Sequence, residues 1–143
     1  MHVFTYLPSW GGRSVEHFAP KSKHPDLAYE WTNYRLVCGV MNSRKKEFED
    51  VIDPFEQIDG WFQIQLTSMK VFPAEHLTET QKTRVQDTIA RLKLNEKDCR
   101  DARAIYYDEY LAQENPLPFR LLKKWSPFVA REVERQGLRR TND

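Results

Sequence analysis

The stretch "VEHFAPKSKHPDLAYEWTNYRLVCGVMNSRKKEFEDVIDPF", residues 15–55, decides the expected fold. Pro20 and Pro25 bracket a polar loop, because proline lacks a backbone donor and disfavours helix in the residue before it. Residues 27–40 mix aromatic and β-branched side chains, which favour extended strands. Residues 41–52 are rich in Lys and Glu and suit a short helix. The predicted order is therefore strand, loop, strand and helix.

The segments on either side of this stretch carry further strand patterns. Upstream, residues 2–18 contain two β-leaning runs joined by the turn residues "PSWGG" at 8–12, which predicts a hairpin. Downstream, the Asp-Pro pair at 53–54 is expected to end the helix. The runs "WFQIQL" at 61–66 and "MKVF" at 69–72 then predict a second hairpin.

The C-terminal half has the sequence features of helices with marked ends. Thr78 and Gln81 form a capping-box pattern that predicts the start of one helix. Asn95 is expected to cap the next, and Pro127 and Gly137 to begin and end a third. The expected class is α+β, with one domain over residues 1–143, a front part over about 1–55 and a helical part over about 78–138.

Length and composition favour a packed globular protein. The chain has 143 residues, 40% of them hydrophobic and 30% charged, which suits one domain with a real core. Its apolar runs are far shorter than the roughly 20 residues that span a bilayer, and its first residues do not resemble a signal peptide. We therefore expect a cytoplasmic protein that does not cross a membrane. Its two cysteines exclude a disulfide scaffold and an all-cysteine zinc site.

One group of polar residues in residues 15–55 has the composition of a hydrolytic site. Glu16 and His17 are adjacent, and Asn33 and Asn42 follow. Hydrolysis of a phosphodiester needs a base for water and a cation to neutralise the leaving oxygen. Carboxylate and amide oxygens are ligands that Mg²⁺ or Mn²⁺ prefers. The alternative is that these four residues are ordinary structural or solvent-exposed side chains with no role in catalysis.

The overall charge of the chain does not by itself indicate a protein that binds a polyanion. The net charge is only +1, whereas nucleic-acid-binding proteins usually have a basic surface. Positive residues cluster locally, and the candidates for phosphate contacts are Lys21, Arg44, Lys45 and Lys46. Such a cluster is more often a solvated face. A chain of this charge is expected to depend on a partner subunit or self-association for tight binding.

The same residues resemble the core of bacterial HNH endonucleases. The resemblance rests on an E-H-F-x-P-K-S opening at residues 16–22, a W-x-N middle at 31–33, and an N-x-x-K close at 42–45 followed by Asp-Pro. It implies a ββα-metal core, here with an additional hairpin and C-terminal helices. It also implies an endonuclease that hydrolyses DNA.

The resemblance also implies a role for each matched residue. His17 would be the general base and Asn33 the residue that orients it. Glu16 and Asn42 would bind one Mg²⁺ or Mn²⁺ ion, and Lys45 would contact phosphate. Proteins that resemble this chain often act in bacterial defence against phage, sometimes beside an ATPase, so that a protein partner of that kind or a homo-oligomer is implied as well.

One departure from the family concerns zinc. Many relatives carry paired cysteines for a structural zinc ion, but here Cys38 stands alone and Met41 occupies the position of its partner. A structural zinc site is therefore not expected. Two alternatives to the endonuclease stay open: a non-catalytic nucleic-acid-binding or partner-binding module on an HNH scaffold, and a zinc-binding module. The apolar C-terminal residues either complete the core or form a docking surface.

Overall fold

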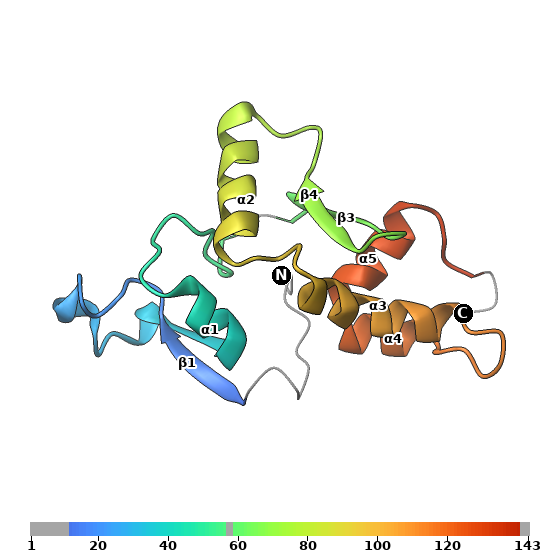
Figure 1. The fold of residues 1–143 in the computed structure, drawn as a ribbon, viewed down its shortest axis with the longest axis horizontal. Helices are drawn as coiled ribbons and strands as arrows, with labels where there is room; N and C mark the ends of the chain where they lie inside the picture. The colour runs from blue at the N-terminus through green and yellow to red at the C-terminus, as the bar shows by residue number, and fades with distance from the viewer. Residues whose placement is uncertain (1–11, 57–58, 141–143) are drawn as a thin grey trace.

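The structure, a computed structural model, describes residues 12–56 and 59–140. Within these residues the fold is α+β, as predicted, with five α-helices and two two-stranded antiparallel sheets. The molecule is elongated. A hairpin and a short helix lie at one end, a cluster of helices lies at the other, and the second hairpin and the helix after it lie between them (Figure 1).

The front unit has the predicted order of strand, loop, strand and helix. Strand β1 (Arg13–His17) pairs antiparallel with β2 (Tyr34–Cys38), and helix α1 (Gly39–Lys45) follows directly and packs on both strands. The loop over residues 18–33 contains two short 3-10 turns, Pro25–Leu27 and Trp31–Asn33. The hairpin predicted over residues 2–18 falls largely outside the described residues.

Helix α1 is shorter than predicted. It ends at Lys45, and Lys46 adopts a left-handed backbone with φ of +49°, so that the Asp-Pro pair at 53–54 does not terminate it. The acidic residues that follow instead bind to other parts of the chain. Glu49 pairs with Lys23 and Asp50 pairs with Arg91. These tertiary contacts favour an irregular segment over two further helical turns.

The central hairpin and the following helix confirm the sequence interpretation. Strand β3 (Phe62–Gln65) pairs antiparallel with β4 (Lys70–Pro73). Helix α2 (Glu79–Arg91) begins with the predicted capping box: Thr78 accepts from the backbone of Gln81, whose side chain accepts from the backbone of Thr78. Two backbone donors at the helix start are thereby satisfied.

Three helices complete the chain: α3 (Lys97–Leu111), α4 (Phe119–Trp125) and α5 (Pro127–Arg135). Helix α4 was not predicted. The expected cap for α3 was wrong, because Glu96 is the N-cap and the Asn95 side chain bonds to the backbone N–H and C=O of Val71. Pro127 and Gly137 do bound α5, and Gly137, with φ of +68°, closes a Schellman motif there.

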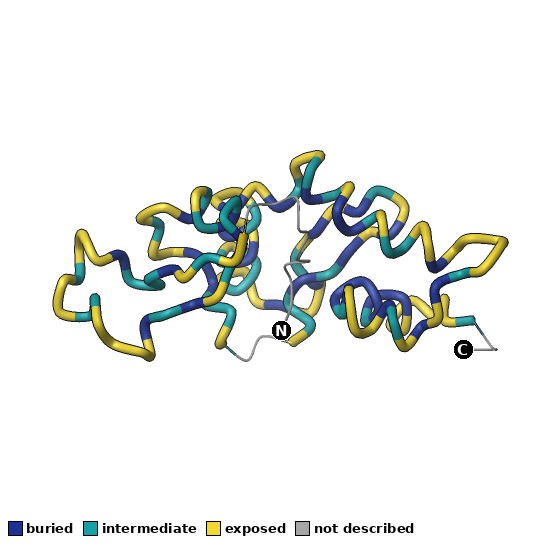
Figure 2. Tube along the Cα trace, turned by 90° about the horizontal axis from the view of Figure 1, so that it is seen from below, coloured by how far each residue is buried: buried dark blue, intermediate teal, exposed yellow. Residues whose placement is uncertain are grey.

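The core joins the front and back units. Buried segments lie mostly in the strands and helices, whereas the loop over residues 18–33 is largely exposed (Figure 2). Phe119, Leu122 and Phe128 belong to the core, so much of the apolar C-terminal sequence completes it. Polar contacts also cross between the units: the buried Thr88 hydroxyl accepts from Ile52 N at 2.9 Å. No helix in the described part of the chain is long and apolar enough to span a bilayer.

Candidate functional site

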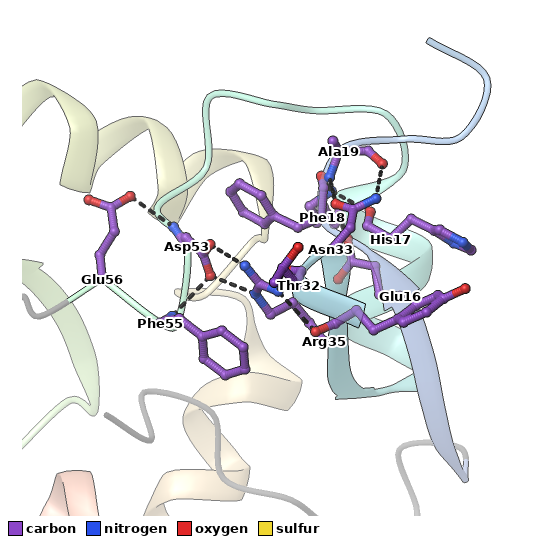
Figure 3. Close-up of polar contacts among 12 residues, drawn as sticks. Glu16, His17, Phe18, Ala19, Thr32, Asn33, Arg35, Asp53, Phe55 and Glu56 are labelled. Carbon is purple, nitrogen blue, oxygen red and sulfur yellow. Dashed lines mark hydrogen bonds and ion pairs between the residues drawn. The ribbon is translucent and has the colours of Figure 1, made fainter. Parts of the chain in front are cut away.

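The β1–β2 hairpin sorts the candidate side chains onto two faces. Side chains along a strand alternate between faces, so Glu16 and its neighbour His17 point in opposite directions. Glu16 is 7% exposed on the face covered by α1, whereas His17 is half-buried on the outer face. Figure 3 shows His17 pointing away from the polar cluster around Arg35. The strand therefore separates the two residues that the sequence places side by side.

The His17 imidazole is held by a backbone carbonyl. Its Nε2 lies 3.0 Å from the carbonyl oxygen of Ala28, and the Tyr34 hydroxyl donates to the same oxygen at 2.7 Å. A carbonyl oxygen only accepts hydrogen bonds, so Nε2 carries the proton and Nδ1 of the neutral ring has the lone pair. The Tyr34 ring also packs edge-on against the imidazole, with centroids 5.0 Å apart. The arrangement fixes both the ring orientation and the nitrogen that can act as a base.

Asn33 does not contact this imidazole. Its amide nitrogen donates to the carbonyls of Ala19 (3.0 Å) and Leu27 (3.2 Å), and its oxygen accepts from Ala19 N at 2.7 Å (Figure 3). These three bonds use both amide hydrogens and the oxygen of a side chain that is 6% exposed. The predicted role of Asn33 in orienting His17 is therefore not carried by a direct bond. Asn33 fixes the loop that carries Ala28, and it positions the imidazole only through that loop.

Glu16 forms a buried ion pair with Lys45. Lys45 Nζ lies 2.7 Å from Glu16 Oε1, and the two side chains are 5% and 7% exposed. The same ammonium donates to the carbonyl oxygen of Phe18 at 2.7 Å. Burial raises the pKa of Glu16, and the nearby Lys45 only partly offsets that rise. Lys45 therefore serves an internal contact in this structure, and the expected phosphate contact is not available to it.

Sequence reasoning missed a second buried ion pair beside Glu16. The Arg35 guanidinium binds both carboxylate oxygens of Asp53 and also donates to the carbonyls of Thr32 and Tyr34 (Figure 3). The Phe55 ring stacks 4.1 Å from the guanidinium carbon. Burial alone would raise the pKa of Asp53, but its bonds with Arg35 hold that pKa below the ordinary value. No local pattern in the sequence signals this pair, because Arg35 and Asp53 lie 18 positions apart.

Asn42 lies on the same side of the hairpin as Glu16. Its amide nitrogen donates to the Ser14 hydroxyl at 2.7 Å, and Ser14 shares the inner strand face with Glu16. The amide oxygen of Asn42 and the carboxylate of Glu16 are thus hard oxygen donors on the side of the hairpin that α1 covers. In kind they suit Mg²⁺, which often takes one or two protein ligands and keeps several waters.

The surroundings of Glu16 oppose a second cation. Lys45 already neutralises the carboxylate, and Arg35 also lies close enough to act on it electrostatically. The adjoining cavity has a volume of about 30 Å³, which accommodates a water molecule and not a hydrated ion. A metal ion can bind Glu16 only if Lys45 leaves it. The described residues contain no cluster of three or more His, Cys, Asp or Glu side chains placed to hold a metal.

The remaining candidate cations differ in availability. Arg44 is committed to the protein, since it pairs with Asp98 at 2.6 Å and bonds to the Cys99 sulfur at 3.1 Å. Lys21 and Lys46 are exposed and can meet a phosphate. Of the four predicted nucleic-acid contacts, only these two have ammonium groups in solvent.

No protein-family model matches the chain, and no curated protein is significantly similar to it.

Proposed function

We propose that this chain is a metal-dependent HNH-type endonuclease that hydrolyses phosphodiester bonds in DNA, with His17 as its general base. The observation that carries the proposal is the bond from His17 Nε2 to the carbonyl of Ala28. It leaves Nδ1 with a lone pair on the outer face of a β-β-α unit whose E-H, W-x-N and N-x-x-K motifs resemble those of HNH enzymes.

His17 would act on the attacking water. Its Nδ1 accepts a proton from water while Nε2 stays bound to Ala28, so the imidazolium that forms keeps a hydrogen-bond acceptor. Tyr34 packs against the ring and donates to the same carbonyl, which restricts the orientation of the imidazole. A positioned general base of this kind contributes about 10² to 10⁴-fold to a rate.

Glu16 and Asn42 would hold the single Mg²⁺ or Mn²⁺ ion. When bound, such an ion would neutralise charge on the leaving oxygen. The protein's own contribution would be to release Glu16 from Lys45, because the two cations compete for one carboxylate. Once released, Lys45 would be able to contact phosphate. Lys21 and Lys46 are exposed and are able to do so already.

The second candidate is a non-catalytic nucleic-acid-binding or partner-binding module on the same scaffold. The buried Glu16–Lys45 pair favours it, because a carboxylate that keeps its lysine cannot bind a metal. The family resemblance suggests a role in bacterial defence against phage, with a protein partner such as an ATPase or a second copy of the chain, and this setting rests on the resemblance alone. A cytoplasmic location is part of the proposal and rests on the sequence expectation that no signal peptide or membrane span is present.

The deciding experiment is plasmid cleavage with Mg²⁺ or Mn²⁺, with and without EDTA. The endonuclease proposal predicts nicking that requires the metal and is lost in His17→Ala. The matched control is His76→Ala, in which nicking should persist, because His76 is exposed between β4 and α2. Activity that survives an excess of EDTA would contradict the metal-dependent mechanism. Metal-independent DNA binding without cleavage would support the non-catalytic module.

A further inference from the structure

The outer face of the β1–β2 hairpin gathers exposed apolar side chains next to His17. Val15 and Leu36 are cross-strand partners, 60% and 71% exposed, and they form the next pair on the same face as His17 and Tyr34, two register positions away. In the adjoining loop Trp31 is 86% exposed and Tyr29 is 91% exposed. Single exposed apolar residues are normal, but a contiguous group of this kind marks a binding surface.

The aromatic rings of this face form a line that ends at the candidate base. The Trp31 and Tyr34 rings meet edge-on with centroids 5.6 Å apart, and Tyr34 meets His17 in the same way at 5.0 Å. Tyr29 follows Ala28, whose carbonyl holds His17. A ligand that stacks on Trp31 therefore lies beside the group that would activate water.

The strand residues of this face carry a positive charge that suits an anionic ligand. The outward-facing strand residues include Arg13, which is exposed, and no carboxylate, because Glu16 points inward. In the loop that follows β1, Lys21 is exposed, and so are Asp26 and Glu30, of which Glu30 lies between Tyr29 and Trp31 in the sequence. Exposed aromatic rings beside cations such as Arg13 and Lys21 are typical of surfaces that bind single-stranded nucleic acid, where bases stack on the rings and phosphates contact the cations. In a duplex the base faces are covered by neighbouring base pairs.

We propose that Trp31, assisted by Tyr29, stacks on an unpaired nucleobase next to the scissile phosphate, so that the preferred substrate is single-stranded or locally unpaired nucleic acid. This inference rests on the proposed endonuclease for the role of His17, and it adds the substrate class. Trp31 is the principal contact, because it combines the larger ring with near-complete exposure.

Binding is measured in EDTA, where hydrolysis does not contribute. The probes are a fluorescein-labelled thymidine oligonucleotide, an abasic oligonucleotide of equal length and charge, and a duplex. Trp31→Ala should weaken binding of the thymidine oligonucleotide by about 5- to 150-fold, the usual effect of losing one stacked base. It should leave abasic binding unchanged within about twofold, because the phosphate contacts are retained. Trp31→Phe should restore most of the affinity.

Trp125→Ala is the matched control. Trp125 is 44% exposed on α4, far along the chain from the hairpin, and its ring meets Tyr106. It should not change binding of any probe. Melting curves check that both variants are folded, and because Trp31 is exposed we expect little loss of stability. Equal binding of thymidine and abasic probes by the original chain would overturn the stacking proposal, and so would an unchanged thymidine affinity in Trp31→Ala.

Cleavage in Mg²⁺ separates this proposal from the endonuclease itself. Base-dependent binding lost in Trp31→Ala, together with no cleavage of any probe, would overturn the endonuclease and support the stacking surface. Cleavage of duplex and single strand at equal rates, unaffected by Trp31→Ala, would support the endonuclease and overturn the substrate class. Faster cleavage of the thymidine oligonucleotide than of the duplex, reduced in Trp31→Ala, is the result expected.

Discussion

Replacing Lys45 by Met tests the most unusual feature of the site, the buried Glu16–Lys45 ion pair. The substitution keeps much of the side-chain volume but leaves the Glu16 carboxylate, 7% exposed, without its main counter-charge. Removing one partner of a buried pair commonly costs about 3–5 kcal/mol. The structure allows a more specific expectation, because Glu16 can escape the penalty by taking up a proton.

Protonation sets an upper limit on the cost of the lost charge. At pH 7 the solution lies about 2.5 pH units above the ordinary carboxyl pKa of 4.5, so holding Glu16 neutral costs at most about 3.4 kcal/mol. Loss of the ammonium's bond to Phe18 O adds about 1 kcal/mol. We therefore expect Lys45→Met to lower the free energy of unfolding by about 3–4 kcal/mol at pH 7.

The same reasoning predicts a pH dependence with a definite sign. Without Lys45 the pKa of Glu16 in the folded state is raised further above its unfolded value, so the folded state binds the proton more tightly. Stability is then fully retained below about pH 4.5 and is lost as the pH rises through the folded pKa. The destabilisation by Lys45→Met should shrink to about 1 kcal/mol at pH 4.5.

Urea denaturation followed by tryptophan fluorescence measures these differences. Lys46→Met is the matched control, since Lys46 is adjacent but exposed, and it should change stability by less than about 0.5 kcal/mol. In a Glu16→Gln background, Lys45→Met should cost only about 1 kcal/mol, because no buried charge is left behind. An equal loss at pH 4.5 and pH 7, or an undiminished loss in the Glu16→Gln background, would refute the ion-pair account.

Three further outcomes follow from the site. His17→Ala should slow cleavage by about 10² to 10⁴-fold while calorimetry shows Mn²⁺ binding retained, since the base is not a proposed metal ligand; comparable loss of Mn²⁺ binding would contradict that division of roles. Lys46→Ala should reduce the slope of log K against log salt for DNA binding by about 0.9, whereas Lys45→Met should leave the slope unchanged if Lys45 stays on its internal partner. Asp53→Asn should destabilise the fold by about 1.5–3 kcal/mol at pH 7, because it weakens a charged pair with Arg35. The pKa of Asp53 is lowered in the folded protein, so the stability that the pair contributes is present above the unfolded pKa and is lost as the pH falls through the folded pKa. The difference in melting temperature between the original chain and Asp53→Asn should therefore narrow below about pH 4. A difference that stays constant with pH would argue against the pair.

Much of the fold could be predicted from sequence because its signals are local. The capping box at Thr78 and the helix limits at Pro127 and Gly137 depend on residues a few positions apart. The same is true of the central hairpin and of the strand, strand, helix order in the front unit. Failures came where a distant partner competed: Asn95 bonds to a strand instead of capping α3.

The sequence alone determined which side chains were candidates for the site, and tertiary structure decided what each one contacts. Strand alternation, which is local, already places Glu16 and His17 on opposite faces, but it does not specify the partner of either side chain. Lys45 meets Glu16 across 29 positions of sequence, and Asn33 binds Ala19 and not the imidazole. A motif specifies residue types and spacing. The partner of a buried charge or amide, by contrast, is whichever group the packed chain places within hydrogen-bond distance, and that depends on how the loop and helix dock on the hairpin.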